Sequence, residues 1–156
     1  MMLINRNGWK MSELCTIHAS FVLWRNKGIL FKGKSGSGKS ELSLKFIENK
    51  GAVLVADDVV LLETRKNRLF GRSPENIQGL LEIRNVGISR YEFIAEAEAD
   101  LVVNLVETKQ NLERLPKNKF ENILGVEIPA IDLYAEDATI LEKIIVKLRD
   151  SLLKTE

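Results

Sequence analysis

The chain has 156 residues, of which 45% are hydrophobic, and its formal net charge is +1. Basic and acidic residues are interleaved, so the charge points neither to nucleic acid nor to an anionic membrane surface as a partner. The single cysteine, Cys15, excludes an internal disulfide, and no long apolar segment or cleavable signal precedes it. We therefore expect one cytoplasmic domain over residues 1–156, in which residues 1–12 form an extension that need not be ordered.

The first predicted elements are two strands and a helix. Residues 15–24 alternate as a strand does, 25–28 have turn chemistry, and 29–31 form a short apolar strand that pairs back. Residues 41–49 predict a helix whose apolar face carries Leu42 and Phe46. A hairpin is therefore expected to lead into the segment between the second strand and this helix.

That segment is a complete P-loop. It consists of Gly33, Lys34, Ser35, Gly36, Ser37, Gly38, Lys39 and Ser40. The glycines let backbone N–H groups surround a polyphosphate, Lys39 brings positive charge to the β- and γ-phosphates, and the Ser40 hydroxyl is suited to bind Mg²⁺. A flexible Gly/Ser loop with the same letters is the alternative, but the flanking strand and helix favour a nucleotide site.

The remaining elements are mostly strands. Apolar segments lie at 52–56, 59–62, 80–88, 101–106 and 123–131. Residues 138–154 predict an amphipathic C-terminal helix. Because the strands follow one another through turns rather than crossover helices, we expect an α/β fold with a mixed, partly antiparallel sheet around a P-loop kinase core.

Asp57 and Asp58 are the second chemical signal. They directly follow a buried strand, one helix downstream of Lys39, which places carboxylates beside the phosphates. Phosphoryl transfer needs a bound Mg²⁺, positive charge on the transferred group and a proton acceptor, and two adjacent carboxylates could divide the metal and base roles. An Asp pair at a strand end is also common turn chemistry, but the P-loop favours function. Residues 117–120 lack the carboxylate of a guanine-reading motif, so a small kinase is preferred to a GTPase.

Four segments carry a resemblance to a known family. They are Ile17-His18-Ala19-Ser20, the P-loop, Val55-Ala56-Asp57-Asp58, and the run from Gly79 to Ile88 that contains Glu82-Ile83-Arg84. In this order they resemble the P-loop catalytic domain of HPr kinase/phosphorylase, which phosphorylates a serine of the phosphocarrier protein HPr. Glu113-Arg114-Leu115-Pro116 is a weaker match. The fold implied is that of the HPr kinase C-terminal domain, which is similar to PEP carboxykinase.

The resemblance also implies roles for single residues. Asp57 would be the general base toward the incoming serine, and the acid in the reverse direction, while His18 would lie nearby and tune it. Arg84 would hold the active-site loop or a phosphate, and Lys39 would complete the catalytic set. The proton affinity of a carboxylate does depend on the charge of a neighbouring imidazole.

The implied cofactors are ATP and Mg²⁺, with Ser40, Asp58 and Glu82 around the metal. In the family's reverse reaction, inorganic phosphate attacks phosphoserine and pyrophosphate is released. The partner would be an HPr-like phosphocarrier protein, and the family assembles as homo-hexamers. The chain resembles a short form of the family that consists of the catalytic domain alone.

Some positions depart from the family pattern. Ala19 and Asn85 replace glycines, and residues 132–137 lack the arginine of the family's Pro-Gly-Arg loop, so the resemblance favours the kinase activity over the phosphorylase activity. Two other functions stay open: a P-loop kinase for a small metabolite, and a module that senses nucleotides without transferring phosphate.

Overall fold

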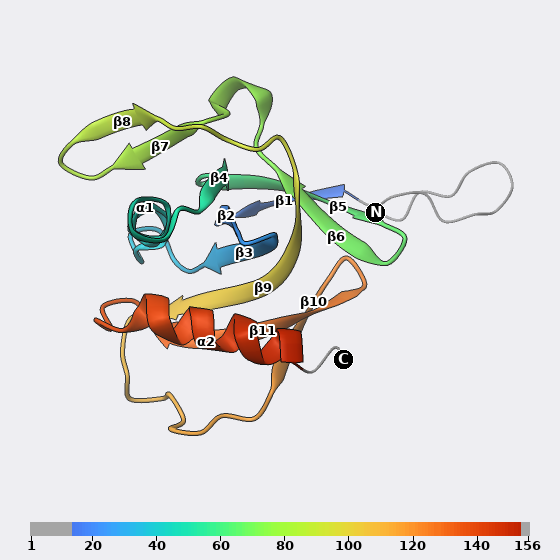
Figure 1. Ribbon diagram of the computed structural model, residues 1–156, viewed down its shortest axis with the longest axis vertical. Coiled ribbons are helices and arrows are strands. Elements are labelled where there is room, and N and C mark those ends of the chain that lie inside the picture. Colours follow the sequence, from blue (N-terminus) through green and yellow to red (C-terminus); the bar gives the residue numbers. More distant parts are fainter. Residues whose placement is uncertain (1–13, 154–156) are drawn as a thin grey trace, which may run out of the picture.

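The computed structural model describes residues 14–153, and nine strands of this part of the chain form one mixed sheet (Figure 1). The extension expected at residues 1–12 lies outside the described residues. Across the sheet the order is β1 (Leu14–His18), β5 (Val59–Arg65), β6 (Arg68–Arg72), β9 (Ala97–Val106), β3 (Lys27–Lys32), β2 (Ser20–Trp24) and β4 (Val53–Ala56). Beyond the two residues of β9 that pair with β6, the side of β9 opposite β3 pairs with β11 (Val126–Tyr134), which pairs with β10 (Lys119–Ile123).

The predicted hairpin forms, but the strand before it is divided. β2 and β3 pair antiparallel around a turn in which Arg25 and Asn26 have positive φ. The predicted strand 15–24 is two strands, because β1 pairs with β5 whereas β2 pairs with β3 and β4. Ala19 lies between them and its N–H donates to the carbonyl of Asp58. A long-range partner therefore splits a pattern that is continuous in sequence.

Several strand ends meet at one edge of the sheet. β3 pairs parallel to β9, and β9 parallel to β11. β4 runs in the same direction as β3, since both pair antiparallel to β2. The segments that follow these four strands therefore lie at a common edge, which is where open α/β sheets bind their ligands.

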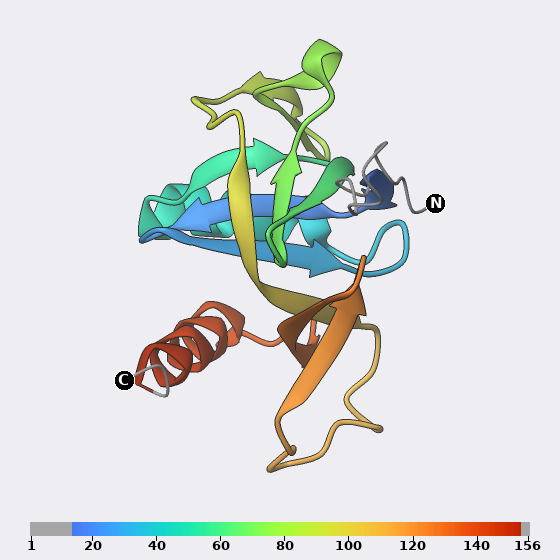
Figure 2. The same ribbon diagram turned by 90° about the vertical axis from the view of Figure 1, so that its right-hand side faces the viewer.

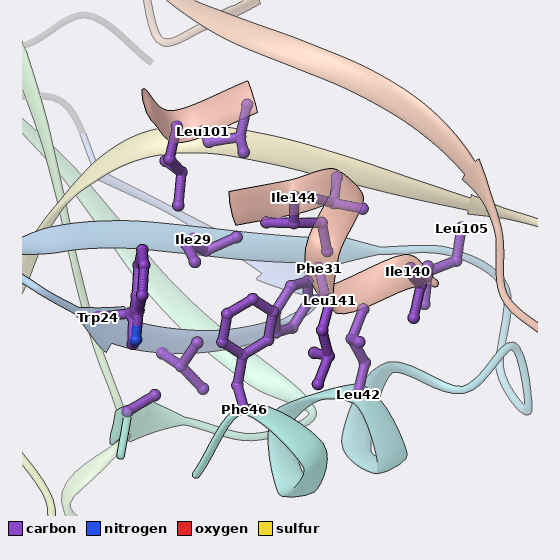
Figure 3. Close-up of a cluster of buried hydrophobic side chains, with 14 residues drawn as sticks. Trp24, Ile29, Phe31, Leu42, Phe46, Leu101, Leu105, Ile140, Leu141 and Ile144 are labelled. Atoms are coloured by element: carbon purple, nitrogen blue, oxygen red, sulfur yellow. The ribbon is translucent and has the colours of Figure 1, made fainter. Parts of the chain in front are cut away.

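Both helices cover one face of the sheet. α1 (Lys39–Lys50) and α2 (Ile140–Leu153) pack with β2, β3 and β9 in one hydrophobic cluster (Figure 3). At its centre Phe46 of α1 stacks on Phe31 of β3 at 5.9 Å between ring centroids and meets the edge of Trp24 at 6.3 Å. A second cluster, which includes Phe21 and Leu30, fills the opposite face, where β5 and β6 supply Leu62 and Leu69.

The predicted segment 80–88 is a separate two-stranded sheet. β7 (Leu80–Ile83) and β8 (Gly87–Arg90) pair antiparallel beside α1 (Figures 1 and 2), after a short 3₁₀ helix at Glu75–Ile77. Leu81 is fully buried, and the Tyr91 hydroxyl donates to Glu48 of α1 at 3.0 Å. The predicted strand 123–131 instead spans the turn between β10 and β11 and the first part of β11, and β10 was not predicted. No helix within residues 14–153 has the length and apolar character needed to cross a membrane.

Replacing Phe46 by alanine tests how strongly the core holds α1. Because Phe46 is fully buried and contacts two aromatic rings, Phe46→Ala should lower the free energy of unfolding by about 3–5 kcal/mol. Urea denaturation followed by circular dichroism measures this. Phe120, which is 56% exposed, is the control, and Phe120→Ala should cost less than about 1 kcal/mol. Equal losses in the two variants would contradict the packing described for α1.

Candidate active site

The P-loop connects β3 to α1 and depends on its glycines. Gly36 and Gly38 have φ values of 79° and 103°, which side chains rarely adopt. A Cβ on Gly33 would lie 2.4 Å from the Ser37 hydroxyl oxygen. The Lys39 ammonium donates to the carbonyls of Gly33 and Lys34 at 2.8 and 2.9 Å, so it lies across the loop. The loop thus has the shape and the charge to hold a polyphosphate.

Asp57 is the carboxylate that meets the P-loop. Its Oδ1 atom accepts hydrogen bonds from the hydroxyls of Ser40, at 2.8 Å, and Ser20, at 2.7 Å. Its Oδ2 atom lies 3.4 Å from the backbone nitrogen of Glu82. Asp57 is only 7% exposed, and a buried carboxylate needs such donors because its desolvation is costly. Residues from β2, α1 and β7 therefore converge on the end of β4.

Ser20 was not among the predicted site residues. It is fully buried on β2 and is separated from Asp57 by 37 positions in the chain. The only signal for it in the sequence is a hydroxyl that opens an otherwise apolar strand, two residues after His18. Its role depends on the pairing of β2 with β4, which no local pattern predicts.

Asp58 and His18 lie beside this centre and are both exposed. Asp58 has a φ of 66°, which turns the chain between β4 and β5. His18 ends β1 and is paired with Val59, the residue that follows Asp58. The pairing of β1 with β5 therefore brings the histidine close to the acidic pair. Within residues 14–153 no hydrogen bond joins its imidazole to either carboxylate.

The β7–β8 hairpin brings Glu82 and Arg84 to the site in different ways. A terminal guanidinium nitrogen of Arg84 lies 3.8 Å from the position of a Cβ on Gly36, so Arg84 lies over the P-loop. Glu82 reaches Asp57 through its backbone nitrogen, and its side chain is exposed. Arg84 and Lys39 thus place two positive charges at the loop.

Lys32, the last residue of β3, has a different role. Its ammonium pairs with Glu121 of β10 at 2.9 Å, and Glu121 also accepts a bond from Asn104 at 2.6 Å. Burial alone would raise the pKa of Glu121, but the hydrogen bonds from Asn104 and Lys32 outweigh it and hold that pKa below the usual value. Lys32 therefore anchors the strand that leads into the P-loop.

The oxygen atoms at this centre suit Mg²⁺. The hydroxyl of Ser40 lies against Asp57, and Asp58 and Glu82 add two exposed carboxylates. Within residues 14–153, no three or more His, Cys, Asp or Glu side chains cluster as a metal site. Mg²⁺ is usually bound through one or two carboxylates together with phosphate oxygens and waters, so this sparse set fits a metal that arrives with a nucleotide.

The glycine loop joins a parallel strand to a helix, and the serine after the loop lysine donates to a buried carboxylate. These features define a P-loop phosphate-binding domain. The family model described as HPr Serine kinase C-terminal domain matches residues 9–155, and the chain belongs to this family. The predicted fold and family are confirmed.

Known proteins agree with this assignment. The chain is 35% identical over 131 residues to HPr kinase/phosphorylase of Malacoplasma penetrans, covering 77% of this chain and 43% of that protein. For the HPr kinase/phosphorylase of Mycoplasma mycoides subsp. mycoides the identity is 39% over 129 residues, covering 74% of this chain and 41% of that protein. The structure of the Hpr(Ser) kinase/phosphatase from Coxiella burnetii matches with a TM-score of 0.78 and 29% identity, covering 90% of this chain and 99% of that chain. The chain thus spans about two fifths of the length of the curated relatives it matches.

Replacing Ser20 by alanine tests the support of the buried carboxylate. Asp57 would lose one of its two hydroxyl donors, so Ser20→Ala should lower the free energy of unfolding by about 1–3 kcal/mol. Urea denaturation at neutral pH measures the change. Ser35, an exposed serine of the P-loop, is the control, and Ser35→Ala should change stability by less than about 0.5 kcal/mol. No difference between the two variants would show that the Ser20 bond contributes nothing.

Proposed function

We propose that this domain transfers the γ-phosphoryl group of ATP, in the presence of Mg²⁺, to a serine hydroxyl of an HPr-like phosphocarrier protein. The observation that carries the proposal is the contact between Asp57 and Ser40, which holds a buried carboxylate beside the P-loop. The relatives named above supply the acceptor, since they are called HPr kinase/phosphorylase. We expect enzyme and acceptor to meet in the cytoplasm.

Binding and charge stabilisation would come from the loop and its two cations. The backbone N–H groups of the P-loop surround the β- and γ-phosphates, and Lys39 is already positioned across the loop. Arg84 lies over Gly36 and would meet the equatorial oxygens of the transferred group. Positive charge at this place stabilises the transition state more than the ground state.

Asp57 is the proposed proton acceptor. Its Oδ1 atom is fixed by Ser20 and Ser40, whereas Oδ2 has only the long 3.4 Å contact with the Glu82 nitrogen. Oδ2 is thus the oxygen better placed to take the proton of the acceptor serine as its oxygen attacks phosphorus. His18 would tune this carboxylate through its own charge.

Asp58, Glu82 and Ser40 are the proposed Mg²⁺ ligands. When bound, Mg²⁺ would neutralise charge on the β- and γ-oxygens. Because the Ser40 hydroxyl donates to Asp57, Asp57 would also lie near a metal bound by Ser40. The metal role proposed for Asp58 and the base role proposed for Asp57 therefore have to be separated by experiment.

The same residues could carry out the reverse reaction. An oxygen of inorganic phosphate would attack the phosphorus of phosphoserine, the serine oxygen would leave with the proton held by Asp57, and pyrophosphate would remain in the P-loop. The turn after β11 contacts the P-loop through Ala135, whose Cβ lies 3.8 Å from the position of a Cβ on Gly38. Residues 132–137 around this turn lack the arginine of the family's Pro-Gly-Arg loop. Forward transfer therefore has more support than phosphorolysis. The homo-hexamer implied by the family stays a prediction.

Transfer of labelled γ-phosphate from ATP onto an HPr-like protein of the same genome tests the proposal. Wild type should label a serine in the presence of Mg²⁺. Lys39→Ala should reduce the rate by about 100-fold or more, because it removes a positive charge that stabilises the transferred phosphoryl group. Lys45→Ala, which changes an exposed lysine of the same helix, should retain full activity.

Two results would overturn the kinase assignment. ATP binding without labelling of the carrier would favour a nucleotide-sensing module. Transfer to a small hydroxyl compound instead would favour a metabolite kinase.

A Mg²⁺ titration of the transfer rate separates the two carboxylate roles. Asp58→Asn and Glu82→Gln should raise the Mg²⁺ concentration for half-maximal rate by roughly tenfold or more. Asp57→Asn should lower the rate at saturating Mg²⁺ by about 100-fold or more, because excess metal does not replace a proton acceptor. Recovery of Asp57→Asn at high Mg²⁺ would instead make Asp57 a metal ligand.

A further inference from the structure

The proposed reaction gives the bound nucleotide a direction. The γ-phosphate must face Asp57, which follows β4, on one side of β3. β9 and β11 lie on the other side of β3. A nucleotide that extends across the loop away from Asp57 would therefore bring its nucleoside end toward the carboxyl ends of β9 and β11.

The turn between β11 and α2 is in direct reach of the P-loop. The Cβ of Ala135 lies 3.8 Å from the position of a Cβ on Gly38, the glycine that precedes α1. The N–H of Ala135 donates to the carbonyl of Val106, the last residue of β9, at 3.3 Å. A group that passes over Gly38 away from Asp57 thus meets this turn first.

An aromatic ring and an ammonium group lie at this turn. Tyr134 ends β11 and is half-buried, and the Lys109 ammonium lies 5.3 Å from the centre of its ring. The Tyr134 hydroxyl donates to Glu136 at 3.0 Å, which fixes the ring. Tyr134 belongs to neither hydrophobic cluster of the fold, so core packing does not account for a tyrosine here.

We propose that the nucleoside of ATP binds over the turn between β11 and α2, with its base stacked on Tyr134 and Lys109 beside it. This subsite rests on the proposed use of ATP. Stacking on an aromatic ring contributes substantially to the binding of a base, and a lysine at the ring adds a hydrogen-bond donor for the ribose or the α-phosphate. The subsite makes the domain select a nucleoside triphosphate over inorganic polyphosphate.

The test compares two ligands that share the phosphates and differ in the nucleoside. Affinities for ATP and for inorganic tripolyphosphate, each with Mg²⁺, are measured by calorimetry on the full chain. Tyr134→Ala should raise the Kd for ATP by about tenfold and leave the Kd for tripolyphosphate unchanged within about twofold. Lys109→Ala should raise only the Kd for ATP, by about two- to fivefold. Because the side chain of Lys109 is exposed, Lys109→Ala should keep the fold even if Tyr134→Ala does not.

The controls locate the effect. Tyr134→Phe keeps the ring and should bind ATP as wild type does, and Phe120→Ala removes an exposed ring of β10 and should change neither affinity. Equal weakening of both ligands in Tyr134→Ala and Lys109→Ala, or unchanged ATP affinity in both, would overturn the subsite while leaving phosphate binding intact. Wild type that binds neither ligand would overturn the proposed function, and the subsite with it.

Discussion

The site depends on a carboxylate that is removed from water. Asp57 is buried at the end of β4, where an ionised group is tolerated only if donors replace its hydration. Ser20 and Ser40 provide those donors from two other elements. One charged group thereby joins the central sheet to the start of α1. The β7–β8 hairpin adds a weaker contact through the nitrogen of Glu82.

The remaining architecture packs against both faces of the strand that leads into the P-loop. α1 is docked through Phe46, which lies between the rings of Phe31 and Trp24 (Figure 3). On the other face, Lys32 is tied to Glu121 directly before the P-loop begins. Close packing on one face and a hydrogen-bonded ion pair on the other fix both ends of the loop, which is what a preorganised phosphate site requires.

Local patterns predicted the elements whose partners are close in the chain. The β2–β3 hairpin and α1 formed where they were expected, because turn residues and apolar spacing act over a few positions. The predicted strand 101–106 also formed, as the second part of β9, although its partners β3 and β11 lie far away in the chain. The division of residues 15–24 into β1 and β2 was missed, since β1 takes its partner from β5. The place of Ser20 was missed for the same reason. Pairing between distant strands leaves no local trace beyond the alternation of side chains.

The sequence by itself determined the phosphate-binding loop and the family, because the groups that hold a polyphosphate are consecutive in the chain and need only a strand before them and a helix after them. It also determined that two carboxylates follow a buried strand. Only the tertiary structure decided which of them faces the loop: Asp57 lies inside against Ser40, while the turn at Asp58, with its positive φ, leaves that side chain exposed. It also decided that Arg84 and Ala135 lie at the loop. These contacts join residues far apart in the chain, and only the packing of whole elements brings them together.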